Sequence, residues 1–479
     1  MKKLIEIIIN IFVEYVNLIA VRESNVSYTY KEIYTRAKGL ANTLNSMYKE
    51  PITIALVANN SVNWIVVFFG VLLSKHRLVI FPSTFGIIKT SHVVINSEAT
   101  LLFTSLDIGG LELYLSGFCR AIKINNLKWN HHGNDIEHHE NKDDHIITYS
   151  PRQLNPCIIT ESSILQKMRL LDRYDIFKEG DTYIAYSDFS SNYILGLLLP
   201  FIHGTTIVIS KDEDSWAMSN TIQENNSEVV ILNSRQFENL YNEIIEDSIS
   251  IFNDLILTFK LEWLRKIILK KRVKKYFPNL RLLVILNSTI NPKIETTLKS
   301  IKIPYIVTYG RTHEHNIETF SRPESFVQGS IGEILDPSSI NDILEDDSLV
   351  QIIVDDKVVY RFLYANKNMI QTEQGFIISE NIELALKNIS PVIRDCIVIY
   401  VGEQLTLIMV PDMRYANFYG YDLNYIREYI WEEIQKINKC VHTFERIDNL
   451  IILPGDFSYD TYGRVMKDYY NDLRENLHL

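Results

Sequence analysis

The stretch Tyr305–Glu314, YIVTYGRTHE, joins an apolar run to a glycine and a polar segment. The apolar run predicts a buried strand, and a glycine after a strand lets the backbone approach a ligand closely. The hydroxyl of Thr312 and the carboxylate of Glu314 are suitable partners for phosphate oxygens and a hard cation. Taken alone, the stretch favours a plain turn after a strand, so its interpretation depends on the rest of the chain.

Short β-branched runs alternate with amphipathic helical segments on both sides of this stretch. Ile52–Val57, Val229–Leu232 and Leu282–Ile285 predict strands, and Val62–Leu73 predicts a helix. This alternation is typical of buried, largely parallel sheets packed between helices. We therefore expect an α/β fold, with a large N-terminal domain of mixed, mostly parallel sheets sandwiched by helices.

The last hundred or so residues show a different pattern. Leu423–Asn438 predicts a long helix, and Cys396–Val401 and Leu405–Val410 predict strands of a small α+β unit. Polar turn residues near positions 340–370 mark a change between the two patterns. We predict a large domain over residues 1–365 and a small C-terminal domain over residues 366–479.

Composition excludes several classes of protein. The net charge of −11 gives no general attraction for nucleic acid. The four cysteines are far apart in sequence, so neither a disulfide framework nor a cysteine zinc site is expected, and a reducing cytoplasm fits. Glu6, Asn10 and Glu14 interrupt the apolar start at helical spacing. That spacing favours an amphipathic first helix over a signal peptide.

Several segments in this order resemble the AMP-forming, acyl-adenylate-synthesising superfamily of acyl- and aryl-CoA synthetases, peptide-synthetase adenylation domains and luciferases. They are Val26–Asn45, Ala55–Ser74, Tyr309–Glu314, and Ile377–Val401 with its Asn381-Ile382-Glu383 triplet. The resemblance implies activation of a carboxylic acid with ATP and Mg²⁺, followed by acyl transfer to the thiol of CoA or of a carrier protein. It places Tyr309, Gly310, Thr312, His313 and Glu314 against the nucleotide. Because His313 occupies the usual glutamate position, Glu314 is the candidate metal ligand.

The phosphate-binding loop departs from the family pattern. The resemblance places it at Ile147–Glu161, with Ser150 and Arg152 as candidate phosphate contacts, but this stretch contains no glycine. Pro151 and Pro156 also lack a backbone N–H. Such a loop works by presenting successive N–H groups to phosphate, so the sequence predicts that this cradle is lost.

Four further positions concern the rest of the same pattern. Asn287 lies where the family has a small segment that forms the adenine wall, and Asp347 is the candidate ribose contact. Tyr364-Ala365 replaces the Gly-Arg pair at the hinge between the domains. Arg464 occupies the position of the catalytic lysine, and it keeps the positive charge with a different shape and reach.

These departures leave three hypotheses open. The chain is an acid-activating ligase with unconventional groups, a catalytically inactive scaffold or carrier-binding partner, or an enzyme that starts from a preactivated acyl group.

Two other segments can be interpreted either as ordinary surface structure or as functional sites. The histidine-rich stretch 131–145 favours a solvated loop over a metal site. The basic run 260–275 favours a solvated helix face, with an anionic membrane or an acidic carrier protein as the alternatives.

Overall fold

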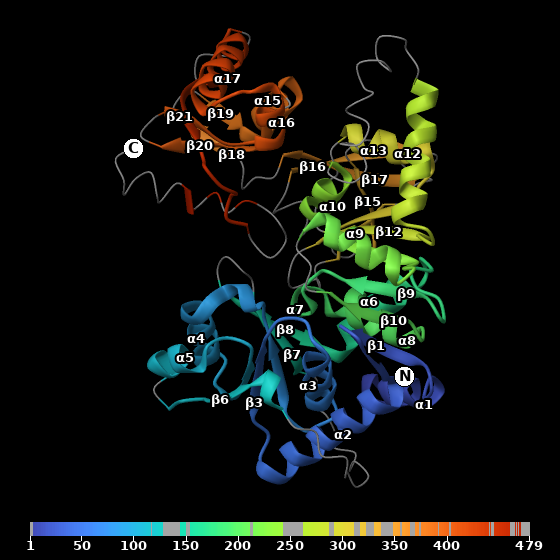
Figure 1. The fold of residues 1–479 in the computed structure, drawn as a ribbon. Helices are drawn as coiled ribbons and strands as arrows, with labels where there is room; N and C mark the ends of the chain where they lie inside the picture. Colours follow the sequence, from blue (N-terminus) through green and yellow to red (C-terminus); the bar gives the residue numbers. More distant parts are fainter. Residues whose placement is uncertain are drawn as a thin grey trace. The chain divides into compact units, whose positions relative to one another are not determined.

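The computed structural model has the predicted α/β architecture, with two extended sheets and a smaller C-terminal sheet (Figure 1). The chain divides into two compact units, Met1–Pro337 with Ile353–Val359, and Ser338–Ile352 with Tyr360–Leu479. The predicted boundary between residues 365 and 366 falls outside the described residues and stays a prediction. The structure describes residues 3–115, 117–127, 144–149, 154–210, 214–242, 262–286, 292–310, 317–321, 330–336, 348–354, 357–364, 369–372, 375–390, 392–401, 404–439, 441, 445–459, 465, 467 and 469–470.

The longer sheet has a block of parallel strands at its centre. Its strand order is β16-β17-β15-β14-β13-β12-β11-β9-β10-β1-β2, and β13, β12, β11, β9, β10 and β1 pair in parallel. The bounds are β1 (Ile19–Glu23), β2 (Val26–Thr29), β9 (Thr182–Ala185), β10 (Thr206–Ile209), β11 (Val229–Asn233), β12 (Leu282–Leu286), β13 (Tyr305–Tyr309), β14 (Thr319–Phe320), β15 (Ser330–Ile334), β16 (Ser348–Val354) and β17 (Lys357–Tyr364).

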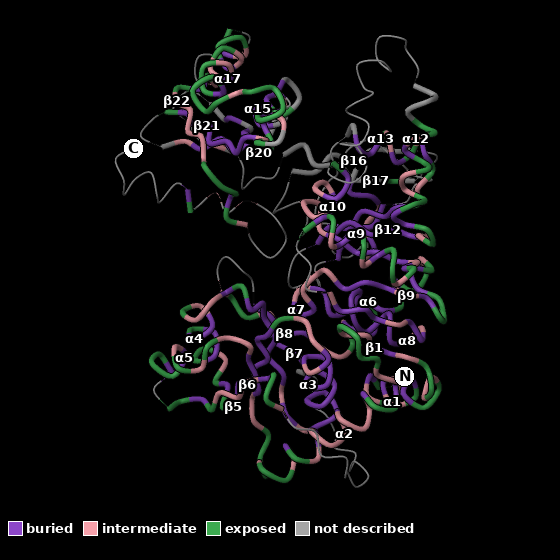
Figure 2. Tube along the Cα trace, in the orientation of Figure 1, coloured by how far each residue is buried: buried purple, intermediate pink, exposed green. Residues whose placement is uncertain are grey.

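Alternate residues of the central strands enter two separate cores, one on each face of this sheet. Val284 of β12 packs in the first core and Ile285 in the second, so the strand is buried on both sides (Figure 2). The helices of the first core are α1 (Leu4–Glu14), α2 (Tyr30–Met47), α3 (Val62–Leu72), α6 (Glu161–Asp172), the π-helical turn η3 (Ile194–Leu198) with α7 (Phe189–Tyr193) before it, and α8 (Leu199–Ile202). Those of the second are α9 (Ser215–Glu224), α10 (Ser234–Leu240), α12 (Glu262–Tyr276) and α13 (Pro292–Ile301).

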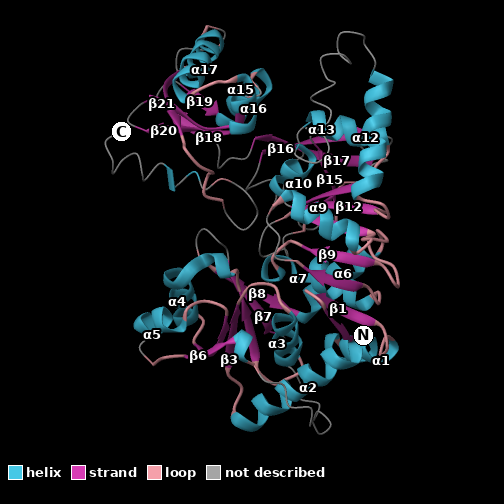
Figure 3. Cartoon of the chain, viewed as in Figure 1, coloured by secondary structure: helices cyan, strands magenta, loops and turns pink. Residues whose placement is uncertain are grey.

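The second sheet shares the first core. Its strand order is β6-β5-β3-β4-β7-β8, and every pair is parallel except the β7–β8 hairpin. The helices α4 (Gly86–Asn96) and α5 (Ile108–Leu115) cover its other face (Figure 3). The strands are β3 (Thr53–Val57), β4 (Arg77–Ile80), β5 (Ala99–Thr104), β6 (Arg120–Lys123), β7 (Asp144–Tyr149) and β8 (Pro156–Thr160).

The predicted amphipathic helix at the N-terminus is confirmed. Helix α1 buries Leu4, Ile8, Ile11 and Phe12, and the Phe12 ring lies 5.3 Å from that of Phe69 between ring centroids. The apolar side of α1 is therefore part of the first core. Among the described residues, no helix has the length and hydropathy needed to cross a membrane.

The C-terminal unit is a small α+β structure, as predicted. The strands β20 (Ile393–Val401), β21 (Gln404–Pro411) and β22 (Ile447–Ile452) form one sheet, and β18 (Met369–Thr372) and β19 (Gly375–Ile378) form a hairpin. Helix α17 spans Leu423–Asn438, which confirms the predicted bounds, and the Asp422 carboxylate caps it by accepting from Tyr425 N at 2.7 Å. The other helices are α15 (Ser379–Ile389) and α16 (Met413–Tyr419).

We expect Gly332→Ala to lower the free energy of unfolding of the large unit by about 3 kcal/mol. Gly332 has a φ of +90°, and a Cβ there would lie 2.0 Å from the Phe320 carbonyl oxygen on the neighbouring strand. Gly180→Ala is the matched control, because its φ is +80° with no atom within 4 Å of the added carbon. It should cost about 1 kcal/mol, from backbone strain alone. Urea unfolding of both variants measures this, and equal losses would contradict the close-approach argument.

Candidate functional site

The carboxyl ends of the parallel strands form the edge of the longer sheet at which a ligand site is expected. β9 and β11 are parallel neighbours. The chain leaves β9 through α7 and α8, which pack in the first core, and leaves β11 through α10, which packs in the second. The two connections therefore lie on opposite faces of the sheet. In open α/β sheets, ligands bind outside the carboxyl ends of the strands at such a switch point.

The predicted glycine motif starts at this edge. β13 ends at the buried Tyr309, and Gly310 follows it. The chain then returns antiparallel as β14, with Tyr309 opposite Thr319, and Glu318 N donates to Tyr309 O at 2.6 Å. The residues on either side of positions 311–316 are thus paired with each other at the ends of β13 and β14. The chain leaves the sheet beside the end of β12, which pairs in parallel with β13.

A buried lysine ties this loop to helix α6. Lys167 is 4% exposed, and its Nζ donates to the carbonyl oxygen of Ile317 at 2.7 Å. The neighbouring Gln166 donates from Nε2 to Asp336 Oδ2 at 2.6 Å, after β15. Helix α6 follows β8 directly. These contacts therefore connect the β7–β8 hairpin of the second sheet to the residues next to β14 and β15.

The segment in which the sequence places the phosphate loop is a hairpin. β7 and β8 pair antiparallel, and Tyr149 lies opposite Pro156 at the open end. Residues 150–155 therefore connect two paired strands, and Leu154 among them has a φ of +51°. Pro156 cannot donate a backbone hydrogen bond, so one potential phosphate donor is absent at the very base of this loop.

Polar side chains also gather where the chain leaves β9. Asn60, between β3 and α3, donates from Nδ2 to Ser187 O at 2.8 Å and accepts from Phe189 N at 3.0 Å. These two bonds join the second sheet to the exit of β9. Asn192 then adopts the non-helical angles φ −143° and ψ 36°, just before the π-helical turn. Such turns inside helices are frequent at functional sites.

Asp188 is the titratable group of this exit. Its Oδ1 accepts from Ser190 N at 2.7 Å and from Ser190 Oγ at 2.5 Å. Burial raises the pKa of the Asp188 carboxyl, and its hydrogen bonds with Ser190 offset part of that effect. Negative charge at the exit of β9 is therefore energetically unfavourable. This exit lies next to the carboxyl ends of the strands, where ligands are expected to bind.

The C-terminal unit contains an ion pair next to the predicted catalytic segment. Lys467 Nζ lies 2.7 Å from Glu383 Oε1 and donates to Ser379 Oγ at 2.9 Å, both on α15. Glu383 Oε1 also accepts from Val398 N at 2.8 Å. Tyr459 and Val465 form an isolated β-bridge, and the predicted catalytic residue Arg464 directly precedes Val465 in the sequence. We call the Lys467–Glu383–Ser379 contacts the α15 latch.

Only two of the predicted site residues belong to the described part of the chain. Tyr309 and Gly310 lie where the sequence predicts them, at the end of β13. The other predicted residues fall outside the described residues, as does the histidine-rich stretch apart from its last two backbone positions; these site residues are Ser150, Arg152, Asn287, Thr312, His313, Glu314, Asp347 and Arg464. The structure therefore tests only the strand residues that flank the predicted loops. The roles of the predicted residues within the loops stay predictions.

Sequence reasoning missed Asn60, Lys167 and Asp188 of the large unit, and Lys467 of the C-terminal unit, as candidate functional residues. Lys167 carries a detectable signal, because it follows Ile164 by three residues and precedes Leu171 by four, within the apolar stripe of α6. A charge at such a position needs a buried partner. Asp188 precedes a short helix, which is the pattern of an N-cap. Nothing in the sequence indicates the long-range contacts of Asn60.

Other chemistries find no support in the described part of the chain. No group of three or more His, Cys, Asp or Glu side chains there is arranged to hold a metal ion. Cys119, Cys157 and Cys396 are free thiols, and burial raises the pKa of each. A thiolate nucleophile at any of these three positions is therefore disfavoured at neutral pH.

We expect Lys167→Met to lower the free energy of unfolding of the large unit by about 1–3 kcal/mol, because the Ile317 carbonyl loses its buried donor. Gln166→Ala, one residue earlier on the exposed side of α6, is the control and should change stability by less than about 0.5 kcal/mol. Hydrogen exchange at Glu318 and Thr319 should also become faster in the Lys167 variant alone. Unchanged exchange there would show that Lys167 does not fasten the loop.

Comparisons with known proteins agree with this geometry. The family model described as AMP-binding enzyme matches residues 12–153, from α1 to the β7–β8 loop. No curated sequence matches the chain. Many solved structures share its fold, including three at low identity. An anthranilate CoA ligase in complex with anthranoyl-AMP has a TM-score of 0.72 and 12% identity, with 98% of this chain and 97% of that chain covered.

The other two are bacterial enzymes. A benzoate CoA ligase from Burkholderia xenovorans LB400 has a TM-score of 0.73 at 12% identity, covering 98% of this chain and all of the other. An O-succinylbenzoate coenzyme A synthetase from Bacillus subtilis, in complex with AMP, has a TM-score of 0.72 at 11% identity, with 96% and 97% covered. The same synthetase has also been solved with ATP and a magnesium ion.

The likeness extends over both units, and the family model covers the N-terminal part of the chain. The switch-point edge, the β13–β14 pairing and the small C-terminal unit occur together in one chain in the order that the sequence motifs predict. This chain therefore has the fold of these acyl- and aryl-CoA ligases, and its residues 12–153 match the family of AMP-binding enzymes.

Proposed function

We propose that the chain activates a carboxylic acid as its acyl-adenylate and then transfers the acyl group to the thiol of CoA or of a carrier protein. The observation that carries this proposal is the loop after β13. It begins directly after Gly310 at the ligand-binding edge, and Glu318 N and Lys167 form hydrogen bonds where it ends. Hydrogen bonds thus hold the described residues that flank Thr312, His313 and Glu314 in the sequence.

The chemistry balances in two steps. A carboxylate oxygen of the acid attacks the α-phosphorus of ATP, and pyrophosphate leaves. The thiol then attacks the acyl carbonyl as its thiolate, and AMP leaves with the electron pair of the broken C–O bond. Bound Mg²⁺ would supply charge neutralisation for the phosphates, with Glu314 as its proposed ligand and Asp347 and Asn287 as proposed contacts of ribose and adenine.

The hairpin at Tyr149 and Pro156 supports slow turnover. With Pro156 at its base and no glycine within it, this loop offers few N–H groups to a triphosphate, and Ser150 and Arg152 remain as its candidate contacts. Loss of one such donor typically costs about 10²-fold in rate. The same observation favours a second candidate, a catalytically inactive scaffold or carrier-binding partner. A cytoplasmic location stays a prediction in both cases.

ATP-dependent hydroxamate formation with a panel of carboxylic acids separates the two candidates. We expect slow turnover that falls by about 10²-fold in Arg464→Ala, because a positive charge is lost where negative charge develops in the transition state. Lys439→Ala, at an exposed lysine that ends α17, is the control and should leave turnover unchanged. Absence of any nucleotide binding at millimolar ATP by calorimetry would exclude the ligase and leave the scaffold.

The α15 latch gives an independent prediction. In Lys467→Met, Glu383 keeps its bond to Val398 N but loses its cationic partner. We expect kcat for adenylation to fall by about tenfold or more while the nucleotide dissociation constant stays within about twofold, because the latch positions the segment of Arg464 and does not itself bind nucleotide. Lys467→Arg should restore most of the loss, since it keeps the charge.

Lys436→Met is the control for the latch, because it removes an exposed ion pair with Glu433 within α17. It should leave both constants unchanged. Equal losses of kcat in the Lys436 and Lys467 variants would mean that the effect is a general weakening of the C-terminal unit. Proton exchange or thermal unfolding of both variants measures that weakening directly.

A further inference from the structure

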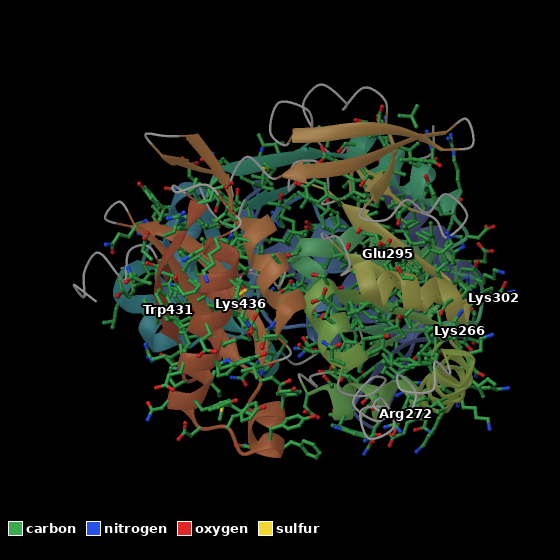
Figure 4. All side chains as sticks on the ribbon, turned by 90° about the horizontal axis from the view of Figure 1, so that it is seen from above. Lys266, Arg272, Glu295, Lys302, Trp431 and Lys436 are labelled. Atoms are coloured by element: carbon green, nitrogen blue, oxygen red, sulfur yellow. The ribbon has the colours of Figure 1, made fainter. Side chains whose placement is uncertain are left out.

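One face of the large unit is strongly basic although the chain as a whole is acidic. We call it the basic patch; its members are Lys266, Lys270, Lys271, Arg272, Lys274 and Lys275 of α12, together with Lys299 and Lys302 at the end of α13. All but Arg272 are exposed, and Arg272 is partly so. Helices α12 and α13 pack against each other, and Figure 4 shows Lys266, Arg272 and Lys302 on the same side of the molecule.

Two nearby acids have hydrogen-bond partners outside the patch. The carboxylate of Glu295, on α13, is buried and accepts a hydrogen bond from Tyr305 OH at 3.3 Å, so it is turned toward the core. The Asp214 carboxylate caps helix α9. Within the described part of the chain, Lys266, Lys270 and Lys274 form no ion pair. These three follow one another at a spacing of four, so their charges lie along one stripe of the helix.

An aromatic side chain borders the cations. Trp216, at the start of α9, is 42% exposed, and its ring meets that of Tyr276 edge-on with centroids 5.9 Å apart. The Arg272 guanidinium and the Lys275 ammonium lie over the Tyr276 ring, at 5.5 Å and 5.0 Å from its centroid. Tryptophan, tyrosine and arginine are the residue types most common among the energetically important residues of protein interfaces.

Among the described side chains of α12, from Lys266 onward, few apolar groups are exposed. Its apolar residues Leu269 and Tyr276 are buried in the second core, and among the described residues of α12 only Ile267 is both apolar and exposed. A helix that binds in the plane of a membrane instead offers a continuous apolar face to the lipid. The patch is therefore suited to electrostatic contact with a surface that matches its size.

The charge of the rest of the chain decides between kinds of partner. The net charge is −11 although the patch alone contributes eight positive charges, so the remaining surface is more acidic than the total indicates. A flat anionic bilayer or a long nucleic acid reaches well beyond α12, which is about 22 Å long, and faces that acidic remainder. A compact acidic protein can contact the patch without approaching the acidic remainder of the surface. The repulsion from that remainder is then weak, because surface charges are screened over about 8 Å at physiological salt.

We propose that the basic patch, with Trp216 at its border, is the docking surface for a compact acidic protein. The proposal stands independently of the adenylation chemistry, because none of these residues belongs to the candidate site. Such a surface acts mainly on the rate of association and gives strong salt dependence. A partner delivered to this face would be held next to the large unit without entering the ligand edge.

The test uses the full chain and a small helical protein with one glutamate-rich helix as the probe. We expect Lys270→Glu combined with Lys274→Glu to weaken binding by about tenfold or more, chiefly through slower association. Lys31→Glu combined with Lys178→Glu is the control, because it makes the same charge change at two exposed lysines elsewhere on the large unit. Trp216→Ala should weaken binding without altering its salt dependence, since it removes an aromatic contact and no charge.

Two results would overturn the proposal. One is equal weakening by the patch and control variants, which would mean that only net charge matters. The other is tighter binding to phosphatidylserine vesicles or duplex DNA than to the acidic protein, with the same variants weakening it, which would assign the patch to a membrane or to nucleic acid. Hydroxamate formation should be unchanged in the patch variants, so failure of this proposal and failure of the ligase proposal are distinguishable.

Discussion

The burial of the parallel strands on both faces is the constraint on which the rest of the structure depends. Val284 and Ile285 of β12 enter different cores, so neither face of this block can carry a ligand site. Functional groups must then come from the loops at the strand ends. The connections after β9 and β11 lie on opposite faces of the sheet, which makes the carboxyl ends of these strands the expected ligand-binding edge. At this edge, the contacts of Glu318 and Lys167 hold the residues that follow β13 in place.

The sequence predicts those parts of the fold whose signal is local. Helix α17 has the expected bounds because its apolar spacing and its cap at Asp422 agree. The runs Val229–Leu232 and Leu282–Ile285 predict β11 and β12, and each strand extends only one residue further. The β7–β8 hairpin was not predicted as a pair of strands, because its pairing is cooperative and neither strand alternates apolar and polar residues.

The candidate site was predicted less completely, for a physical reason. A motif such as Tyr309-Gly310 keeps its identity in sequence, and its position at the end of β13 follows from the strand. The residues that hold a loop in place do so through tertiary contacts with residues far away in the sequence. Lys167 reaches Ile317, and Asn60 reaches Ser187, and neither pairing has a local pattern. The fold is shared with the two CoA ligases at only 11–12% identity. Residues that make tertiary contacts can therefore change between proteins of one fold, because packing tolerates many substitutions.

Helix α1 carries a consequence for how the chain is made. Its apolar residues Leu4, Ile8 and Phe12 pack against side chains as late in the sequence as Phe201, whose ring lies 5.8 Å from that of Phe12. A ribosome that adds about 5–20 residues per second needs roughly ten to forty seconds to reach that partner. During this interval α1 can contact only its nearer partners, such as Tyr34 and Phe69. The core around Phe12 is complete only after Phe201 has been synthesised.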